Sequence, residues 1–378
     1  MPKFYEFFAG GGMARSGLGE SWDCVFANDF SKQKADSYIK NWGDENLTVE
    51  DINKIDSGSL PGHADLAWAS FPCQDLSLAG NGAGLQGCRS GTFWGFLRII
   101  QELKSEGRKP SMIVLENVYG TLTSHEGKDF EAIAKSIAGE GYKLGAVVMD
   151  AVHFVPQSRP RVFIICIDDK RAIPHESVCE RASPAWHPDK VICVYNALPI
   201  GIKNKWVWWN MPEPSQPLTT LKEIIEVDPQ GVRWHTEIET QNILSMMAPL
   251  HRRKVIAAQQ QGSLHVGTIY KRTRNGMQRA EVRFDGIAGC LRTPSGGSSR
   301  QTIMVVDGPS IRTRLISPRE AARLMGLPES YVLPSKYNDA YHLVGDGVVV
   351  PVVAHINQNI LLPVFNRNFQ ANSQMHIA

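Results

Sequence analysis

Apolar and polar residues follow one another along the first 170 residues in a pattern that predicts strands and helices in turn. Short apolar runs, typical of buried strands, lie at 3–9, 23–29, 64–71, 111–117, 143–150 and 161–167. Stretches with apolar residues at helical spacing lie between these runs, at 31–42, 91–106 and 128–141. Strands that alternate with helices predict an α/β fold built on a mostly parallel, doubly wound sheet.

The pattern changes after about residue 170. Prolines, tryptophans and polar segments dominate up to about residue 310, which predicts a smaller, irregular and partly β domain. A helix is then expected from Ser317, because that residue is a good N-cap with Pro318 at the first helical position and Glu320 three residues on. The segment 345–362 predicts a loop followed by an apolar helix. We therefore expect one domain at 1–175 and 340–378, with a second domain and hinge at 176–339.

Composition narrows the class of protein. The chain has 378 residues, of which 43% are hydrophobic and 21% charged, so a large core is expected and global disorder is not. Its seven cysteines are scattered without a C-x-x-C pair, which disfavours a disulfide framework or a zinc ribbon and favours a reducing cytoplasm. We expect no signal peptide and no membrane-spanning segment. The net charge of +2 identifies no partner by itself.

Several reactive side chains follow predicted strands, and such strand ends meet at one rim of a parallel sheet. Cys73 follows the run "DLAWASFP", where a lone cysteine is more often a small buried residue than a nucleophile. Glu116 and Asn117 end the strand at 111–117, and Glu116 suits either an acid in a pocket or a surface carboxylate. One rim can therefore hold the cysteine, the carboxylate and the glycines at 10–12.

The glycine-rich turn "AGGG" lets a ligand approach the backbone, although the G-x-G-x-x-G nucleotide fingerprint fails at Arg15. Asp29 follows the second strand, where a carboxylate can accept hydrogen bonds from ribose hydroxyls. Asp51 suits either such a site or a helix cap.

Two features are cationic. Arg159 and Arg161 are two residues apart in an extended segment, so they are expected to share a face and to grip carboxylates or phosphates. The segment 251–300 holds ten Arg and Lys residues against two acidic ones, a composition that suits either a nucleic-acid surface or a solvated face.

The order of these motifs is more specific than any one of them. A strand that ends in F-x-G-x-G is followed by P-C-Q, then E-N-V, then Q-x-R-x-R. A variable basic region, "SPREAARLMGLP" and a final "GDGVVVP" complete the series. In this order they resemble the DNA cytosine-5 methyltransferases over nearly the whole chain, from Phe4 to about Leu362.

The resemblance implies a class I S-adenosylmethionine-dependent methyltransferase, in which the first domain binds the cofactor and the second recognises the DNA target. The C-terminal helix would return to pack beside the first strand. The cofactor residues carried over by position are Phe8, Ala9, Gly10, Gly12, Asp29, Phe30, Asp51, Ile52, Phe93, Asp346 and Val348. Of these, Asp29 would hold the ribose, Phe30 would stack on the adenine and Asp51 would accept from its amino group. The family usually has Glu at position 29 and Asn at position 346, so these two cofactor contacts depart from its pattern.

The implied reaction needs an activated cysteine. The thiolate of Cys73 would attack carbon 6 of cytosine and make carbon 5 nucleophilic toward the cofactor methyl group, while Glu116 would bond the ring N3. The catalytic residues carried over are Pro72, Cys73, Gln74, Glu116, Asn117, Arg159 and Arg161. The target base would be flipped out of the duplex. The segment from Asp75 to about Thr92 carries five glycines and suits a closing lid.

The expected partner is double-stranded DNA, contacted through Ser77, Arg272, Arg274, Arg292 and Arg300. No metal is expected. We expect a monomeric, cytoplasmic protein without a membrane, associated with the bacterial nucleoid through DNA and functionally paired with a restriction endonuclease.

Three competing functions fit parts of the sequence. A tRNA cytosine methyltransferase of the same superfamily would share the catalytic motifs, but its Cys-Phe-Thr signature is absent. A catalytically silent DNA-binding homologue is disfavoured by the intact P-C-Q and E-N-V. A nicotinamide-dependent oxidoreductase is disfavoured by the imperfect glycine fingerprint and by P-C-Q.

Overall fold

The computed structural model describes residues 1–72, 91–214, 219–274, 276–292 and 300–375, with side chains left out at 274 and after 369. The chain forms two compact units. Unit 1 contains Met1–Met149, Pro160–Pro214 and Val352–Ala378, and unit 2 contains Asp150–Arg159 and Ser215–Pro351.

The borders of the units fall at other positions than the expected 175 and 340. Residues 176–214 belong to unit 1 because their apolar side chains pack on its core. Val191 and Val194 are buried in that core, and the indole of Trp209 donates to the carbonyl of Gly145 over 3.3 Å. The sequence of 176–214 has no regular spacing of apolar residues, so this packing could not be predicted from it.

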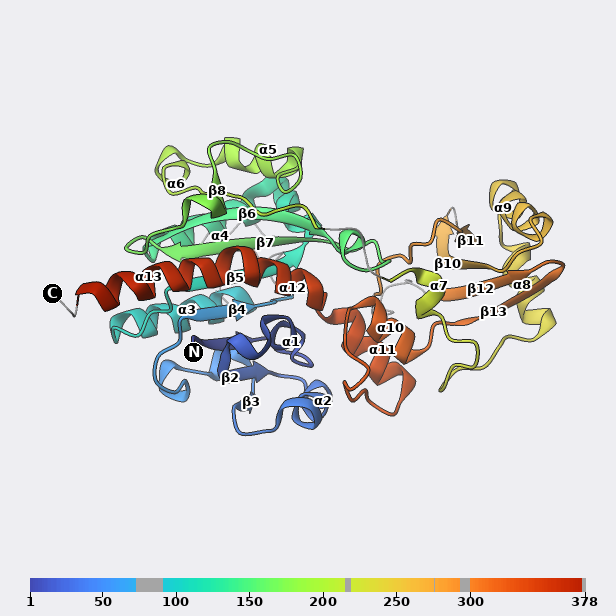
Figure 1. Ribbon diagram of the computed structural model, residues 1–378, viewed down its shortest axis with the longest axis horizontal. Helices are drawn as coiled ribbons and strands as arrows, with labels where there is room; N and C mark the ends of the chain where they lie inside the picture. The colour runs from blue at the N-terminus through green and yellow to red at the C-terminus, as the bar shows by residue number, and fades with distance from the viewer. Residues whose placement is uncertain (73–90, 215–218, 275, 293–299, 376–378) are drawn as a thin grey trace. The chain divides into compact units, whose positions relative to one another are not determined.

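Unit 1 is built on a seven-stranded sheet (Figure 1). The first five strands in its spatial order run parallel to one another. The order across the sheet is β3-β2-β1-β4-β5-β7-β6, and β7 runs antiparallel to β5. The strands are β1 (Lys3–Phe7), β2 (Asp23–Asp29), β3 (Leu47–Val49), β4 (Leu66–Ala69), β5 (Met112–Val118), β6 (Tyr142–Asp150) and β7 (Pro160–Asp168). A further pair, β8 (Val178–Cys179) and β9 (Trp208–Trp209), forms a separate ribbon. The doubly wound α/β expectation is confirmed, and all six predicted strands are present.

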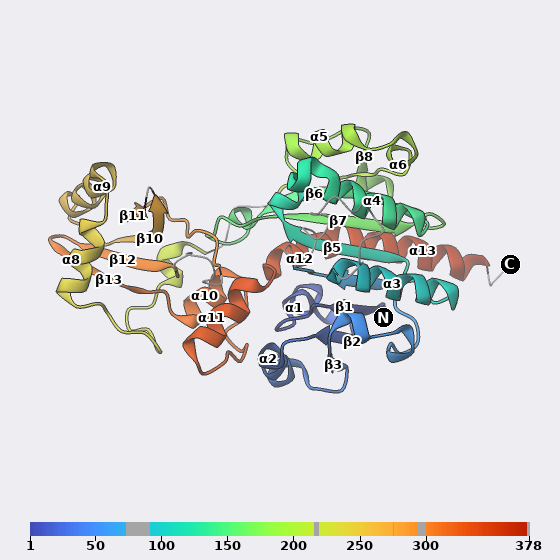
Figure 2. The ribbon, with the colours of Figure 1, turned by 180° about the vertical axis from the view of Figure 1, so that it is seen from behind.

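Helices cover both faces of this sheet, as the front and back views show (Figures 1 and 2). The helices α3 and α4 pack on one face through Phe96, Ile100, Phe130 and Ile133, whereas α12 and α13 lie on the other. The helices of unit 1 are α1 (Met13–Leu18), α2 (Lys32–Trp42), α3 (Thr92–Ser105), α4 (Lys128–Gly139), α5 (Asp189–Ala197), α6 (Ile200–Lys203) and α13 (Leu362–Met375), and α12 (Val350–Ile356) lies in it from Val352 onward.

The C-terminal helix returns to the beginning of the chain, as expected. The indole of Trp22 donates to Asn357 Oδ1 over 2.7 Å, and Asn357 Nδ2 donates to the carbonyl of Leu18 over 3.0 Å. Asn357 lies in a π-helical turn, Asn357–Leu361, between α12 and α13. The helical stretch Tyr337–Phe369 is long and apolar enough to cross a membrane by length and composition, but half of its most apolar window is buried inside the structure, as in a core helix.

Unit 2 contains a four-stranded antiparallel sheet of order β11-β10-β12-β13. Its strands are β10 (His265–Arg274), β11 (Met277–Arg283), β12 (Thr302–Asp307) and β13 (Ser310–Leu315). Its helices are α7 (Leu221–Ile224), α8 (Glu237–Ser245), α9 (Pro249–Gln260), α10 (Pro318–Leu324) and α11 (Tyr337–Asp346). The predicted capping box is present at α10, where the Ser317 side chain accepts from the Glu320 amide.

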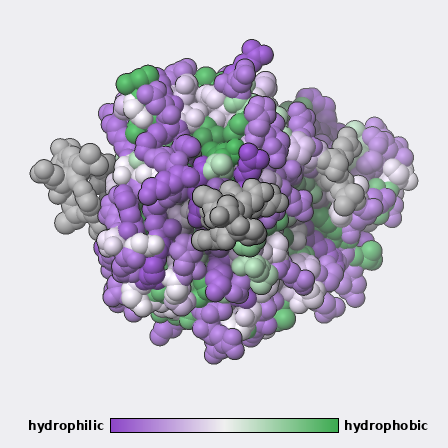
Figure 3. Space-filling model, turned by 60° about the vertical axis from the view of Figure 1, so that its left-hand side comes forward, coloured by the Kyte–Doolittle hydropathy of each residue, from purple (hydrophilic) through white to green (hydrophobic). Residues whose placement is uncertain are grey.

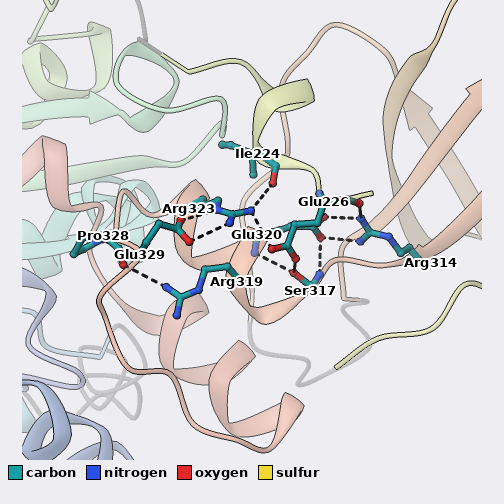
Figure 4. Close-up of polar contacts among 9 residues, drawn as sticks. All are labelled: Ile224, Glu226, Arg314, Ser317, Arg319, Glu320, Arg323, Pro328 and Glu329. Atoms are coloured by element: carbon teal, nitrogen blue, oxygen red, sulfur yellow. Dashed lines mark hydrogen bonds and ion pairs between the residues drawn. The ribbon is translucent and has the colours of Figure 1, made fainter. Parts of the chain in front are cut away.

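A buried ion pair fastens α10 inside unit 2 (Figure 4). The guanidinium of Arg314 donates to both carboxylate oxygens of Glu320, at 2.5 and 2.7 Å, and neither side chain is exposed. Glu320 Oε1 also accepts from the backbone amide of Glu226, and Arg314 donates to the Glu226 carbonyl. The pair therefore joins β13, α10 and the segment after α7.

The face of the molecule in Figure 3 is mostly hydrophilic, with hydrophobic residues in small patches between polar ones. Many of the large apolar side chains are instead buried, among them Trp68, Trp209, Phe96 and Phe130.

Candidate cofactor and catalytic site

The turn after β1 has a left-handed backbone at three of five consecutive residues. Phe8, Gly10 and Gly12 have φ angles of 58°, 56° and 75°. Behind the turn, the indole of Trp42 donates to the carbonyl of Gly11 over 3.1 Å. A Cβ added to Gly12 would lie 2.4 Å from that indole nitrogen, whereas one added to Gly10 would meet nothing within 4 Å. There is thus no space for a side chain at Gly12, where Trp42 is in contact with the turn, whereas Gly10 has free space beside it.

Asp29 closes this turn from the end of β2. Its Oδ2 accepts from the Gly10 amide and its Oδ1 from the Ser31 amide, each over 2.8 Å. The carboxylate is buried, and Phe30 beside it is 75% exposed. A carboxylate has about four acceptor positions, so both oxygens keep capacity for a further donor. The exposed ring next to it is available for stacking.

Sequence reasoning missed Glu6, a buried carboxyl in the middle of β1. Its Oε1 accepts from the Arg15 amide over 3.2 Å, and its Oε2 is buried without a hydrogen-bond partner. Burial raises the pKa of Glu6 to about 8, and the negative charge of Asp29 adds to the effect. The signal was an acidic residue within the apolar run "FYEFFA". Its unpartnered oxygen points to a polar group that the protein alone does not supply.

The other expected cofactor residues of unit 1 have different environments. Asp51 is exposed and caps the 3-10 turn Ile52–Lys54, with its Oδ1 accepting from the Asn53 amide over 2.9 Å. Of the two roles weighed for Asp51, the cap is thus observed. Ile52 and Phe93, the second of which belongs to α3, are buried in the core, and Ala9 is 7% exposed.

The end of β5 carries the expected acid, and the neighbouring strand β7 carries a cation beside it. Glu116 is buried and its Oε1 lies 3.2 Å from the Nε of Arg161 on β7. The two side chains come together because β5 and β7 pair, with Val118 opposite Arg161 and Glu116 opposite Phe163. Arg161 thus grips a carboxylate, as expected of one of the two arginines.

Asn117 joins β5 to the end of the β4 segment. Its Nδ2 donates to the carbonyl of Phe71 over 3.0 Å, and its Oδ1 accepts from the Thr121 hydroxyl over 3.0 Å. Because β4 and β5 are parallel neighbours, this bond holds the backbone just before Pro72 next to Glu116. Pro72 itself is exposed.

Among the described residues, the partners found for Arg159 differ from the Glu116 partner of Arg161. Arg159 belongs to unit 2 and is 2% exposed. Its guanidinium donates to the carbonyls of Leu291, Gly345 and Gly347 at 2.7 to 2.9 Å. Extended spacing places side chains on one face but does not choose their partners, and the expected part of Arg159 in the site stays a prediction.

The remaining expected site residues lie outside the described part of the chain or in unit 2. Cys73, Gln74, Ser77 and nearly all of the expected lid, 75–92, are outside the described residues. Asp346 and Val348 belong to unit 2, so their part in the cofactor pocket stays a prediction. Arg272 and Arg292 are exposed in the same unit, and Arg300 donates to Asn338 Oδ1 over 2.6 Å. Only the backbone of Arg274 is described.

The turn around Gly10 and Gly12, the Asp29 carboxylate and the exposed ring of Phe30 fit a nucleoside cofactor. Within the described residues, no group of three or more His, Cys, Asp or Glu side chains could hold a metal ion. A doubly wound sheet with such a turn at the carboxyl ends of β1 and β2 defines a nucleotide-cofactor enzyme with an acid–cation pair at the same rim.

Comparison with known proteins identifies the class more closely. Residues 2–362 match the family described as C-5 cytosine-specific DNA methylase, and the chain belongs to this family. Type II methyltransferase M.HhaI of Haemophilus parahaemolyticus is 26% identical, over 95% of this chain and 94% of its own length. Type II methyltransferase M.NlaX of Neisseria lactamica is also 26% identical, over 95% of this chain and 96% of its own.

Solved structures share the fold. The Dnmt2 methyltransferase of S. pombe superposes with a TM-score of 0.61 at 17% identity, covering 96% of this chain and 99% of its own. A putative DNA modification methyltransferase from an E. coli prophage has a TM-score of 0.58 at 16% identity, covering 97% of this chain and all of its own. The protein is therefore a DNA cytosine-5 methyltransferase that uses S-adenosylmethionine, and covalent catalysis with base flipping is general to its family.

Proposed function

We propose that this enzyme methylates one cytosine within a specific duplex sequence, with Cys73 as the nucleophile and Glu116 as the acid beside it. The arrangement at the rim of β4 and β5 carries the proposal. The Asn117–Phe71 hydrogen bond holds the backbone that leads into Pro72 and Cys73 next to the Glu116–Arg161 pair. Phe71, which this bond holds beside the acid, comes two residues before Cys73 in the sequence.

The proposed cofactor site is the turn after β1. Asp29 would accept from the ribose hydroxyls and Phe30 would stack on the adenine, since the first is a carboxylate at a strand end and the second an exposed ring. Ile52 and Phe93 would line the apolar side, with Phe8, Ala9, Gly10, Gly12 and Asp51 around the turn. Asp346 and Val348 stay predicted cofactor residues on the family pattern. When bound, S-adenosylmethionine supplies the methyl group.

The chain's own residues would handle the base. The Cys73 thiolate adds to carbon 6 of the flipped cytosine, which forms a C–S bond and makes carbon 5 electron-rich. Glu116, held by Arg161, bonds ring N3 and stabilises the charge that develops there. After methylation a base removes the carbon 5 proton, the C–S bond breaks and the thiolate returns. Gln74 and Ser77 would contact the substrate near this centre.

The biological role follows the names of the relatives. Because M.HhaI and M.NlaX are named type II methyltransferases, we propose that the enzyme protects host DNA alongside a restriction endonuclease of the same specificity. We further propose a monomer that acts in the cytoplasm on nucleoid DNA, without a membrane.

Bisulfite sequencing of DNA from cells that express the protein tests the activity and reveals its target. The proposal predicts conversion-resistant cytosines at one recurring short sequence. Glu116→Gln keeps the shape of the side chain but removes its charge, and it should slow methyl transfer by roughly 10²–10⁴-fold while cofactor binding is retained. If calorimetric titration shows that the cofactor affinity collapses while the rate on saturating cofactor is kept, Glu116 belongs to the cofactor site instead.

A further inference from the structure

The sheet of unit 2 divides the basic segment 251–300 between two faces. One face is covered by α8 and α9, because Ile269, Val282 and Met304 of the sheet pack with Val255 and Ala258 of α9. Figure 1 shows both helices beside the sheet. The cations of α9, including the exposed Arg253 and Lys254, therefore lie beyond this helix layer. They cannot contact the same stretch of a ligand that lies on the other face.

Strand register identifies the residues of the other face. In an antiparallel ladder, residues directly opposite share a face and alternate residues change face. Ile269 and Val282 are opposite each other and face the helices. The pairs Tyr270–Glu281 and Arg272–Arg279 therefore point away from the helices.

Two arginines thus stand directly opposite each other at the outer part of the β10–β11 ribbon. Like charges in this position destabilise a ladder. Arg272 is 58% exposed at its side chain, and its Nε lies 3.8 Å from Glu281, which is too long for a hydrogen bond. The guanidinium of Arg272 also lies 5.8 Å from the ring centre of Tyr270, two residues earlier on the same face of β10.

Several other cations of unit 2 have close partners within the unit. Arg283 forms two hydrogen bonds with Asp285, at 2.5 and 2.7 Å. Arg314 is fully buried against Glu320, and Arg312 lies over the ring of Trp234 at 4.4 Å. The Arg272–Arg279 pair differs because both side chains point away from the helices, with Arg272 exposed and Arg279 half-buried, and because its described ion pair, from Arg272 to Glu281 over 3.8 Å, is long.

We propose that Arg272 and Arg279 form a cross-strand pair that binds duplex DNA from the outward face of the β10–β11 ribbon. This inference deepens the proposed function and rests on it. A two-stranded ribbon fits the major groove, and guanidiniums donate in pairs to phosphate oxygens or to the O6 and N7 of guanine. The amino-acid composition does not predict a role for Arg279, nor that the α9 cations lie away from this DNA-binding face. Both follow from the strand register and from the position of α9.

The test compares two double variants of the full-length enzyme that lose the same charge. Arg272→Ala with Arg279→Ala removes the ribbon pair, and Arg253→Ala with Lys254→Ala removes two exposed cations of α9. Binding is measured by gel shift at several salt concentrations, on a duplex with the methylated site and on a random duplex. Thermal unfolding of both variants reports whether unit 2 still folds, and the milder Arg272→Gln with Arg279→Gln serves if the alanine variant does not.

The ribbon variant should bind the target duplex at least about tenfold more weakly than wild type, and the α9 variant should bind as wild type does. If the two arginines contact phosphates, their loss should weaken binding to both duplexes. The log–log slope of binding against salt should then become flatter by about 1.8, at about 0.9 per lost contact. If the arginines contact guanine, their loss should weaken binding to the target duplex more than binding to the random duplex. Equal loss in the two variants, or unchanged binding in a folded ribbon variant, would overturn the inference. Methylation by the wild-type enzyme on the same duplex separates these outcomes from a failure of the proposed function.

Discussion

Replacing Gly12 by alanine should destabilise unit 1 considerably more than the same replacement at Gly10. Both residues have a left-handed backbone, with φ angles of 75° and 56°. That conformation costs an L-residue roughly 1–2 kcal/mol, so both variants carry this penalty. The loss of unfolded-state freedom, about 0.4–1 kcal/mol in favour of alanine, is also common to both.

The two positions differ in the space around a new Cβ. At Gly12 the atom would lie 2.4 Å from Trp42 Nε1 and 3.1 Å from Tyr38 Cε2, whereas at Gly10 nothing lies within 4 Å. The indole must then shift and weaken its bond to the Gly11 carbonyl. Overpacking of this kind typically costs about 1–3 kcal/mol, and the hydrogen bond about 1 kcal/mol more. We expect Gly12→Ala to lose roughly 2–4 kcal/mol beyond Gly10→Ala.

Urea unfolding of the two variants and of wild type, without cofactor and followed by tryptophan fluorescence, measures this difference directly. The midpoint should fall a little for Gly10→Ala and far more for Gly12→Ala. The reasoning is refuted if both variants unfold at the same urea concentration, because the contact with Trp42 would then carry no weight.

Two further predictions concern buried carboxyls. Glu320→Ala leaves the buried Arg314 guanidinium without its ion-pair partner and should lower the free energy of unfolding by about 3–5 kcal/mol. Glu329→Ala removes a carboxylate that is 64% exposed and should lower it by about 0–1 kcal/mol. Calorimetric unfolding compares the two variants. Because the pKa of Glu6 rises from 4.5 to about 8 on folding, the folded protein keeps a proton that the unfolded chain releases in this range, so stability should fall as pH rises from about 4.5 to 8. Glu6→Gln should remove this part of the pH dependence, and an unchanged slope in urea titrations would contradict the burial of Glu6.

Six strands of the seven-stranded sheet were predictable because each contains an apolar run, as expected of strands covered on both faces of the sheet. The run 23–29 matches β2 residue for residue. By contrast, β3 has only three residues, none of them buried, so no run of apolar side chains marks it. The end of the first unit was also hidden, because residues 176–214 join its core through dispersed side chains such as Trp209.

The candidate site was predictable where a residue type and a strand end coincide, as at Asp29 and Glu116. It was not predictable where partners come from distant segments. Arg159 and Arg161 look alike in the sequence, yet one donates to backbone carbonyls in unit 2 and the other pairs with Glu116. The cross-strand pairing of Arg272 with Arg279 likewise depends on the register of a ribbon, and composition does not contain that register.

The central claim is that Cys73 forms a bond with carbon 6 of the target cytosine. A duplex with 5-fluorocytosine at the methylated position tests it most directly, because fluorine replaces the proton that must leave before the C–S bond breaks. In the presence of S-adenosylmethionine, the wild-type enzyme should form a denaturant-resistant complex with this duplex, and peptide mapping should locate the adduct at Cys73. Cys73→Ser should form none while its thermal unfolding matches wild type. An adduct at another residue, or wild-type turnover by the serine variant, would contradict the account.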